Sequence, residues 1–297
     1  MKNFWYRLLS ALKIIVVMLL IGAATLSIVF AWGYFQHSRQ PSTEVSIPTI
    51  PATEQPTDPP TEPTTEPPEP EHVISRATIG ATGDLLMHMP VIDTARQADG
   101  SYNFDYIFRY LQEYTNAADF AVANLETTLA GAARGYSGYP NFNCPDEIVD
   151  GARNGGFDML LTGNNHSYDT GESGFFRTIE TVRSKGLQTL GTMLNGDEPK
   201  YAIEDINGIK VGMLSYTYQG RPDNGYANRV YLNGLLLHEG AENVVNTFIP
   251  NNPAPFYAEV ESYMLQMRSE GAEALVIFLH WGVDYALPPV AHQTQIA

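Results

Sequence analysis

Four short apolar runs in this sequence each end in polar side chains that could bind a metal ion. Asp84 ends the first run, Glu126 follows the second, Asn165 and His166 follow the third, and His280 ends the fourth. Carboxylate, amide and imidazole groups together form a ligand set that suits Mn, Fe or Zn. The pattern predicts a divalent-metal site, provided that the fold brings the four ends together.

Each of these residues also has an ordinary structural interpretation. Asp84 after a glycine is typical of a helix cap, Glu126 alone of a surface ion pair, and His280 alone of a hydrogen-bonded buried histidine. Asn165 and His166 are also compatible with turn chemistry. A metal-free enzyme that uses Asp84 and Glu126 as an acid/base pair is a further alternative, but such chemistry does not need the neighbouring amide and imidazole. Four run ends of the same character favour a shared metal site.

The apolar runs alternate with helical stretches, which predicts an α/β domain from residue 76 onward. Strands are expected over 76–84, 119–126, 157–163 and 272–282, and a hairpin with an Asn-Gly turn over 201–218. Apolar spacing predicts helices over 104–118, 145–156, 171–186 and 256–271. The fold class is therefore a layered α/β domain whose central sheet is mostly parallel. Because ligands bind beyond the carboxyl ends of such strands, the four run ends are expected along one edge of that sheet.

The first 40 residues are expected to anchor the chain in a membrane. Residues 14–35 carry no charge, and at about 1.5 Å per residue they can cross a hydrocarbon core of about 30 Å. Lys2, Arg7 and Lys13 precede this run, which places the N-terminus in the cytoplasm and the remainder outside. A cleaved signal peptide is the alternative, but the bulky end of the run, "FAWGYFQ", favours one uncleaved transmembrane helix.

Residues 41–75 are expected to form a disordered linker. Pro, Thr and Glu dominate this segment, which has too few apolar side chains to order itself. Proline-rich chains favour the extended polyproline II conformation, so the linker would hold a third region, 76–297, away from the membrane. The sequence thus predicts a single-pass protein of the cell membrane with an extracytoplasmic C-terminal domain.

The formal net charge is −16, to which residues 1–40 contribute +4 and residues 41–71 contribute −7, leaving −13 for residues 72–297. This balance excludes nucleic acid as the main partner, and an anionic substrate would need a cation at the site. Cys144 is the single cysteine, so no internal disulfide can form. It lies in a turn-like stretch without a nearby histidine, which favours a buried thiol over a nucleophile.

The motifs "ATGDLLMH", "ANLETTLAG", "LLTGNNHSYDTG" and "IFLHWGVDY" resemble, in this order, those of the CapA/PgsA capsule-synthesis family. That family is linked to poly-γ-glutamate production and is similar to the calcineurin-like metallophosphoesterases. The resemblance covers residues 76–297 and implies a metallophosphatase-like fold. It also implies metal ligands at Asp84, Glu126, Asn165 and His280. His88 is a further candidate ligand, although it stands four residues after Asp84 where the usual spacing is two.

The resemblance implies hydrolysis of a phosphoester with the help of two metal ions. His166 would then donate a proton to the leaving oxygen, and Asp169 is close enough in sequence to orient His166. A non-catalytic alternative is an anchored component of a capsule synthesis and export complex, which would bind other subunits and an anionic polymer. The family's Gly-His-His-Pro-His block is absent, and the last residues, "PPVAHQTQIA", are typical of the start of a helix. We therefore expect a C-terminally truncated fragment whose two-metal site lacks ligands.

Overall fold

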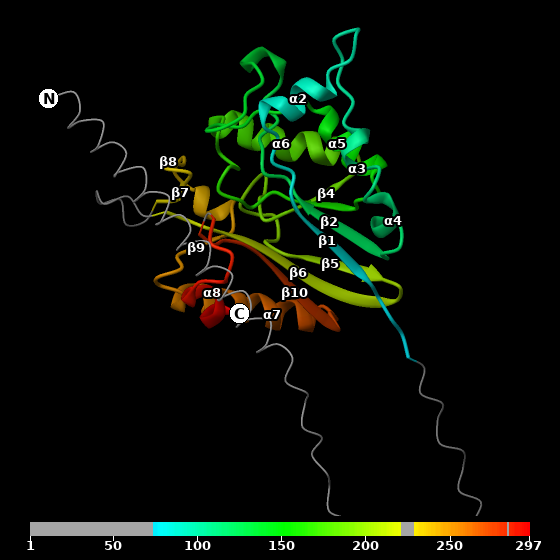
Figure 1. Cartoon of the computed structure of the whole chain (residues 1–297). Helices are drawn as coiled ribbons and strands as arrows, with labels where there is room; N and C mark the ends of the chain where they lie inside the picture. The colour runs from blue at the N-terminus through cyan, green and yellow to red at the C-terminus, as the bar shows by residue number, and fades with distance from the viewer. Residues whose placement is uncertain (1–73, 221–228, 284) are drawn as a thin grey trace, which may run out of the picture. The chain divides into compact units, whose positions relative to one another are not determined.

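Two β-sheets lie between two layers of helices in the computed structural model of this chain (Figure 1). The structure describes residues 74–220, 229–283 and 285–297, all within one compact unit. The predicted anchor over residues 14–35 and nearly all of the predicted linker lie outside these ranges. Within them, no helix combines the length and the apolar character that a bilayer crossing requires.

The first sheet contains four parallel strands in the order β1-β2-β3-β4. Its strands are β1 (Ile79–Asp84), β2 (Phe120–Asn124), β3 (Met159–Leu161) and β4 (Gln188–Leu190). Asp84 pairs with Asn124, and Asn124 pairs with Leu161, so the carboxyl ends of three strands lie level with one another. The loops that follow these ends therefore emerge at one edge of the sheet, as the sequence predicts.

A layer of helices covers the outer face of the first sheet (Figure 1). Its members are α2 (Met89–Ala95), α3 (Asp105–Phe108), α4 (Gln112–Thr115), the 3₁₀ turn η1 (Ala132–Arg134), α5 (Glu147–Asn154) and α6 (Gly171–Ser184). Buried apolar residues of these helices form one core cluster with Ala121, Ala123 and Leu160 of the sheet. Cys144 belongs to that cluster and is fully buried, and burial raises the pKa of its thiol well above the usual value. The prediction of a buried thiol is confirmed.

The second sheet has the order β10-β6-β5, and β9 also pairs with β6. It contains β5 (Ala202–Ile206), β6 (Ile209–Tyr218), β9 (Thr247–Phe248) and β10 (Ala274–His280). The predicted hairpin is confirmed, because β5 and β6 are antiparallel and turn at Asn207 and Gly208, whose φ angles are +54° and +80°. β10 runs parallel to β6.

The faces of the two sheets that meet are apolar. Val122, Met159 and Leu190 of the first sheet share a core cluster with Val211 and Met213 of the second. The outer face of the second sheet packs on α7 (Ala254–Ser269) through a further cluster that contains Leu214, Phe256 and Val260. The remaining elements are β7 (Tyr231–Leu232), β8 (Leu235–Leu236), the 3₁₀ turn η2 (Ala241–Asn243) and α8 (Ala291–Ile296).

The structure corrects two predictions. The strand that ends in His280 belongs to the second sheet, so the candidate residues do not share one sheet edge. The predicted helix over 104–118 is two one-turn helices, α3 and α4, because the backbone N–H groups of Ile107, Leu111 and Tyr114 bond to carbonyls only three residues earlier. The stretch contains two Phe and three Tyr residues, whose helix propensity is lower than that of Ala or Leu, while packing of Phe104 and Phe108 buries its apolar side as predicted.

Candidate functional site

A cleft of about 1120 Å³ opens where the carboxyl ends of β1, β2 and β3 face the end of β10. Most of the side chains singled out from the sequence line it: Asp84, His88, Glu126, Asn165, His166 and His280. The remaining one, Asp169, lies directly behind His166. The face-to-face packing of the sheets brings β10 to the end of the first sheet, so residues from two sheets meet in one cleft.

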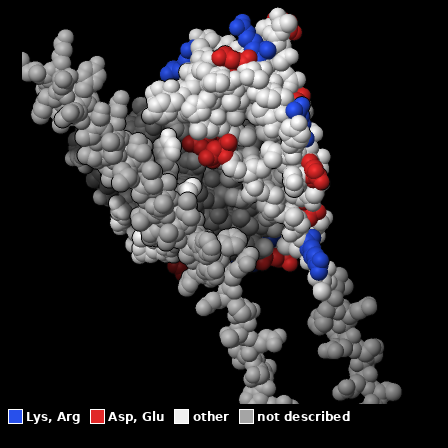
Figure 2. Space-filling view, in the orientation of Figure 1, with Lys and Arg blue, Asp and Glu red and all other residues white. Residues whose placement is uncertain are grey.

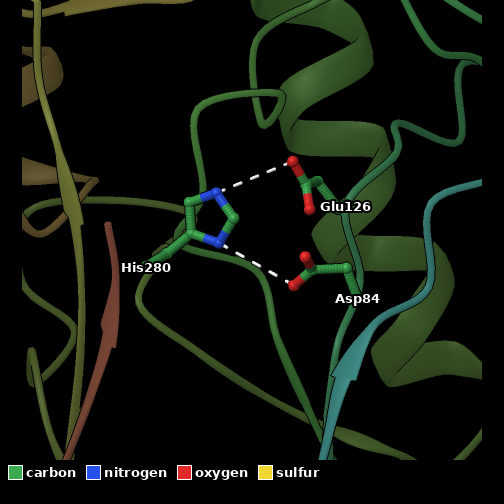
Figure 3. A group of neighbouring side chains, drawn as sticks. All are labelled: Asp84, Glu126 and His280. Atoms are coloured by element: carbon green, nitrogen blue, oxygen red, sulfur yellow. Dashed lines mark ion pairs between the residues drawn. The ribbon is translucent and has the colours of Figure 1, made fainter. Parts of the chain in front are cut away.

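Three of these side chains form a cluster with metal-binding geometry (Figure 3). One ligand atom from each of Asp84, Glu126 and His280 lies within 4.8 Å of the others. His280 stands between the two carboxylates, with Nε2 3.6 Å from Glu126 Oε1 and Nδ1 3.9 Å from Asp84 Oδ1. The Glu126 side chain is buried, whereas that of Asp84 is 49% exposed. The cluster therefore has a buried floor and one ligand open to the cleft.

The surroundings of His280 favour its neutral form. Burial lowers the pKa of its imidazole, and the nearby His166 acts in the same direction, while the Asp84 carboxylate partly opposes them. Nε2 lies 2.7 Å from Asn165 Oδ1, and Nδ1 lies 3.2 Å from Asn124 Nδ2. An amide oxygen accepts and an amide nitrogen donates, so this arrangement places the proton on Nε2 and leaves Nδ1 with a lone pair. A neutral imidazole is the form that binds metal ions.

His166 and Asp169 form a buried pair beside this cluster. His166 Nδ1 lies 2.7 Å from Asp169 Oδ2, and the Asp169 side chain has no exposed surface. The same carboxylate oxygen accepts a hydrogen bond from the backbone N–H of Phe142 at 2.7 Å. With Nδ1 held in this way, His166 Nε2 faces the cleft, 3.9 Å from Glu126 Oε1. The pair has the arrangement in which a carboxylate orients a histidine for proton transfer.

His88 is separate from the cluster. It is exposed at the start of α2, and its ring packs edge-on against Phe142 with centroids 5.0 Å apart. Phe142 contacts the ring of His166 in the same manner at 4.8 Å. His88 therefore lines the cleft, but it is not one of the residues whose ligand atoms converge.

Two buried asparagines tie the strand ends together, and sequence reasoning assigned them no role. Asn124 Nδ2 donates to Asp84 Oδ1 at 2.8 Å, and Asn124 Oδ1 accepts from Asn164 Nδ2 at 3.1 Å. Asn164 also donates to the backbone carbonyl of Leu125 and accepts from the backbone N–H of His166. Their position at the ends of two predicted strands was the available signal. Both amides hold the backbone from which the cluster projects.

Neither Lys nor Arg lines the cleft among the residues that the structure describes. Figure 2 shows acidic side chains near the middle of one face of the domain and a mixture of acidic and basic ones at its top and right-hand edge. The mouth of the cleft carries exposed apolar side chains, including Tyr139, Tyr285 and Leu287. The described lining thus offers an anion no Lys or Arg side chain, which is the situation in which a bound metal would supply the positive charge.

Comparison with known proteins gives a consistent family assignment. Residues 78–297 match the family model described as "Bacterial capsule synthesis protein PGA_cap". The chain is 22% identical over 227 residues to "Capsule biosynthesis protein CapA" of Bacillus anthracis, covering 75% of this chain and 50% of that protein. It is 24% identical over 221 residues to "PGA biosynthesis protein CapA" of Bacillus subtilis (strain 168), covering 72% and 51% respectively. The chain thus spans about half the length of these curated relatives. Since the family model covers most of its length, the chain belongs to the bacterial PGA_cap capsule synthesis family.

Proposed function

We propose that this protein is a CapA-type capsule biosynthesis protein whose cleft hydrolyses a phosphoester with the help of a divalent metal ion. The observation that carries the proposal is the convergence of Asp84, Glu126 and His280 beside the His166–Asp169 pair. One group of side chains suits a metal ion, and the other suits proton transfer. Metal-assisted hydrolysis of a phosphoester uses both kinds of group.

The residues fit a divalent cation in three respects. Their ligand atoms already lie within 4.8 Å of one another, so little rearrangement is needed to surround one ion. Two carboxylates and one imidazole are the donor types that suit Mn, Fe or Zn. Burial lowers the pKa of the His280 imidazole, which favours the neutral form that a metal ion binds. Asn165 Oδ1 lies 2.7 Å from His280 Nε2 and accepts its proton, which leaves Nδ1 with the lone pair for the ion.

Each residue then has a separate task. A cation bound by Asp84, Glu126 and His280 would supply Lewis-acid polarisation of a phosphoryl oxygen and lower the pKa of a water molecule. His166 presents Nε2 to the cleft and would donate its proton to the leaving oxygen. Asp169 accepts a hydrogen bond from Nδ1 of His166 and so holds the ring with Nε2 toward the cleft.

The biological setting is also part of the proposal. The two relatives are called capsule and PGA biosynthesis proteins, which supports a role for this chain in capsule or PGA biosynthesis. The uncharged run over residues 14–35, preceded by Lys and Arg, supports anchoring in the cell membrane with the domain outside. Fusion of a reporter enzyme to residue 297 tests this topology, since a reporter active only in the cytoplasm should then be silent.

The test of function uses the full chain in detergent. Metal content is measured after purification, and turnover of bis(p-nitrophenyl) phosphate is followed with Mn²⁺, Fe²⁺ or Zn²⁺ and with a chelator. We expect metal-dependent turnover that Asp84→Asn removes and that Asp93→Asn, on the exposed side of α2, leaves unchanged. Bound metal without turnover of this or other phosphoesters would replace the hydrolase by a metal- or polymer-binding component. Turnover that persists in the chelator would overturn the metal site and favour acid/base catalysis by carboxylates.

A further inference from the structure

The tip of the β7–β8 hairpin reaches into the cleft from a distant part of the chain. Tyr231–Leu232 and Leu235–Leu236 pair antiparallel, and Asn233 and Gly234 form the turn between them. Asn233 is one of the residues that line the cleft. It comes 64 residues after Asp169 in the sequence, yet its side chain contacts the carboxylate of Asp169 directly. The hairpin therefore contributes a polar group to the buried His166–Asp169 pair.

The amide of Asn233 has two acceptors within reach. Its Nδ2 donates to Asp169 Oδ1 at 3.0 Å and to the backbone carbonyl of Pro140 at 3.1 Å. Nδ2 also lies 3.3 Å from His166 Nδ1. An amide nitrogen carries two hydrogens, and both are used by the two oxygen acceptors when His166 Nδ1 is itself protonated and donates to Asp169 Oδ2. The three groups thus form one consistent network.

This network fills the acceptor positions of the Asp169 carboxylate. Oδ2 accepts from His166 Nδ1 and from the Phe142 backbone, and Oδ1 accepts from Asn233. In this arrangement the carboxylate has no exposed surface, so Asn233 and not water supplies the donor to Oδ1. Without the Asn233 amide, Oδ1 would lose the hydrogen bond that it accepts here, whereas Oδ2 would keep both of its donors. The carboxylate would then be held through Oδ2 alone, which allows it to turn and His166 to turn with it.

The turn itself explains why this position is an asparagine. The φ angles of Asn233 and Gly234 are +47° and +74°, which is the combination of a tight hairpin turn with a left-handed backbone at both central residues. Asparagine tolerates this conformation better than other residues with a side-chain amide. The turn at Asn207 and Gly208 has the same sequence and similar angles, but the Nδ2 of Asn207 donates to the carbonyl of Arg76, which does not line the cleft. The turn requirement is common to both sites, whereas the contact with a buried carboxylate belongs to Asn233.

We infer that Asn233 is a positioning residue that locks the Asp169 carboxylate so that His166 Nε2 points at the metal-binding cluster. It acts through Asp169 and does not itself take part in proton transfer. Its effect on turnover rests on the hydrolase function proposed above, whereas its effect on the His166–Asp169 hydrogen bond does not. The two consequences can therefore be tested separately.

The experiment compares Asn233→Gly with Asn207→Gly in the full chain. Both substitutions keep a turn that accepts positive φ, and each removes one amide, so Asn207→Gly is the matched control for turn stability. The hydrogen bond is read from NMR of metal-free protein with ¹⁵N-labelled histidine, in which His166→Gln assigns the signals. We expect a downfield, slowly exchanging Nδ1–H proton of His166 in the wild type and in Asn207→Gly, and loss of that signal in Asn233→Gly. In the turnover assay we expect kcat to fall about tenfold to a hundredfold with KM nearly unchanged, because the misplaced group acts in the chemical step.

Asn233→Asp is the second variant. It has nearly the same shape and also tolerates positive φ, but it places a carboxylate against Asp169, so it should disturb the signal and kcat at least as much as Asn233→Gly. An unchanged Nδ1–H signal in Asn233→Gly, or equal losses in Asn233→Gly and Asn207→Gly, would overturn the inference. If the wild type has no hydrolytic activity, the proposed function fails, and the NMR comparison still decides the role of Asn233.

Discussion

Replacement of Asp84 by asparagine should have opposite effects on stability in the absence and in the presence of metal. In the metal-free protein, Asp84 and Glu126 hold two negative charges within 4.8 Å of each other. Two unit charges at that separation repel by about 3.5 kcal/mol at an effective dielectric constant of about 20. Because the Asp84 side chain is 49% exposed, solvent screens much of this repulsion, and about 1 kcal/mol is a reasonable net value. The amide oxygen of the variant can still accept the hydrogen bond from Asn124.

Asp84→Asn is therefore expected to raise the melting temperature of the metal-free protein by about 2–4 °C, at about 2–4 °C per kcal/mol for a domain of this size. A metal ion at about 100 times its Kd should stabilise the wild type by about 2.7 kcal/mol, or about 5–11 °C. The variant should lose that gain. Differential scanning calorimetry of chelator-treated and Mn²⁺-loaded samples measures both shifts, with Asp93→Asn as the control.

The opposite sign would refute this reasoning. If Asp84→Asn lowers the melting temperature of the metal-free protein, then the carboxylate stabilises a protonated His280, and the cluster is an ion-pair network. Such a result would also disagree with the burial that lowers the pKa of His280. A metal-induced shift that survives in the variant would place the metal elsewhere.

Three further predictions concern neighbouring residues. Asp169→Asn should lower kcat by at least about a hundredfold while metal affinity in a titration stays within about twofold, because the amide no longer fixes the proton on His166 Nδ1. His280→Asn should make the stability of the metal-free protein less dependent on pH. The pKa of the imidazole is about 6.5 in the unfolded chain and lower in the folded protein, so the wild type binds fewer protons when it is folded. The wild type therefore loses stability as the pH falls through that window. Equal slopes of melting temperature against pH in the two proteins would contradict this. Gly163→Ala should lower the free energy of unfolding by about 1–3 kcal/mol in a denaturant titration, because the added carbon would lie 3.1 Å from the backbone Cα of Gly191. Gly83→Ala is the control and should lower it much less, because no atom lies within 4 Å of the added carbon.

Much of the fold follows from local sequence patterns. The apolar runs before Asp84, Asn124 and Thr162 are strands of one parallel sheet, and the Asn-Gly hairpin forms where predicted. Periodicity does not show which strands share a sheet, however, because β10 is as apolar as the strands of the first sheet. Its partner is β6, which is chosen by long-range packing. Local patterns also failed over 104–118, where tertiary packing of aromatic side chains overrides regular helical hydrogen bonding.

The candidate site was predictable in its residue types but not in its supporting network. Asp84, Glu126 and His280 stand at strand ends, where topology brings side chains together, and they do converge. Asn165 and His166 lie in the same cleft, while the role of His88 as a ligand is not supported by the position of its ring. Asn233 could not be found in this way, because an Asn-Gly pair in a two-residue turn is sufficiently explained by the turn alone. Its second role depends on the contact across 64 residues with Asp169.

The division of the cluster between two sheets has a consequence for how the domain assembles. Asp84 and Glu126 are carried by the first sheet and its loops, whereas His280 ends a strand of the second. Neither sheet alone can present the full set of ligands, so a bound cation would cross-link the two sheets. Metal occupancy would then depend on how the two sheets pack. A substitution in the apolar interface around Val122 and Met213 that shifts one sheet against the other should lower the affinity for the ion, although it changes none of the ligands.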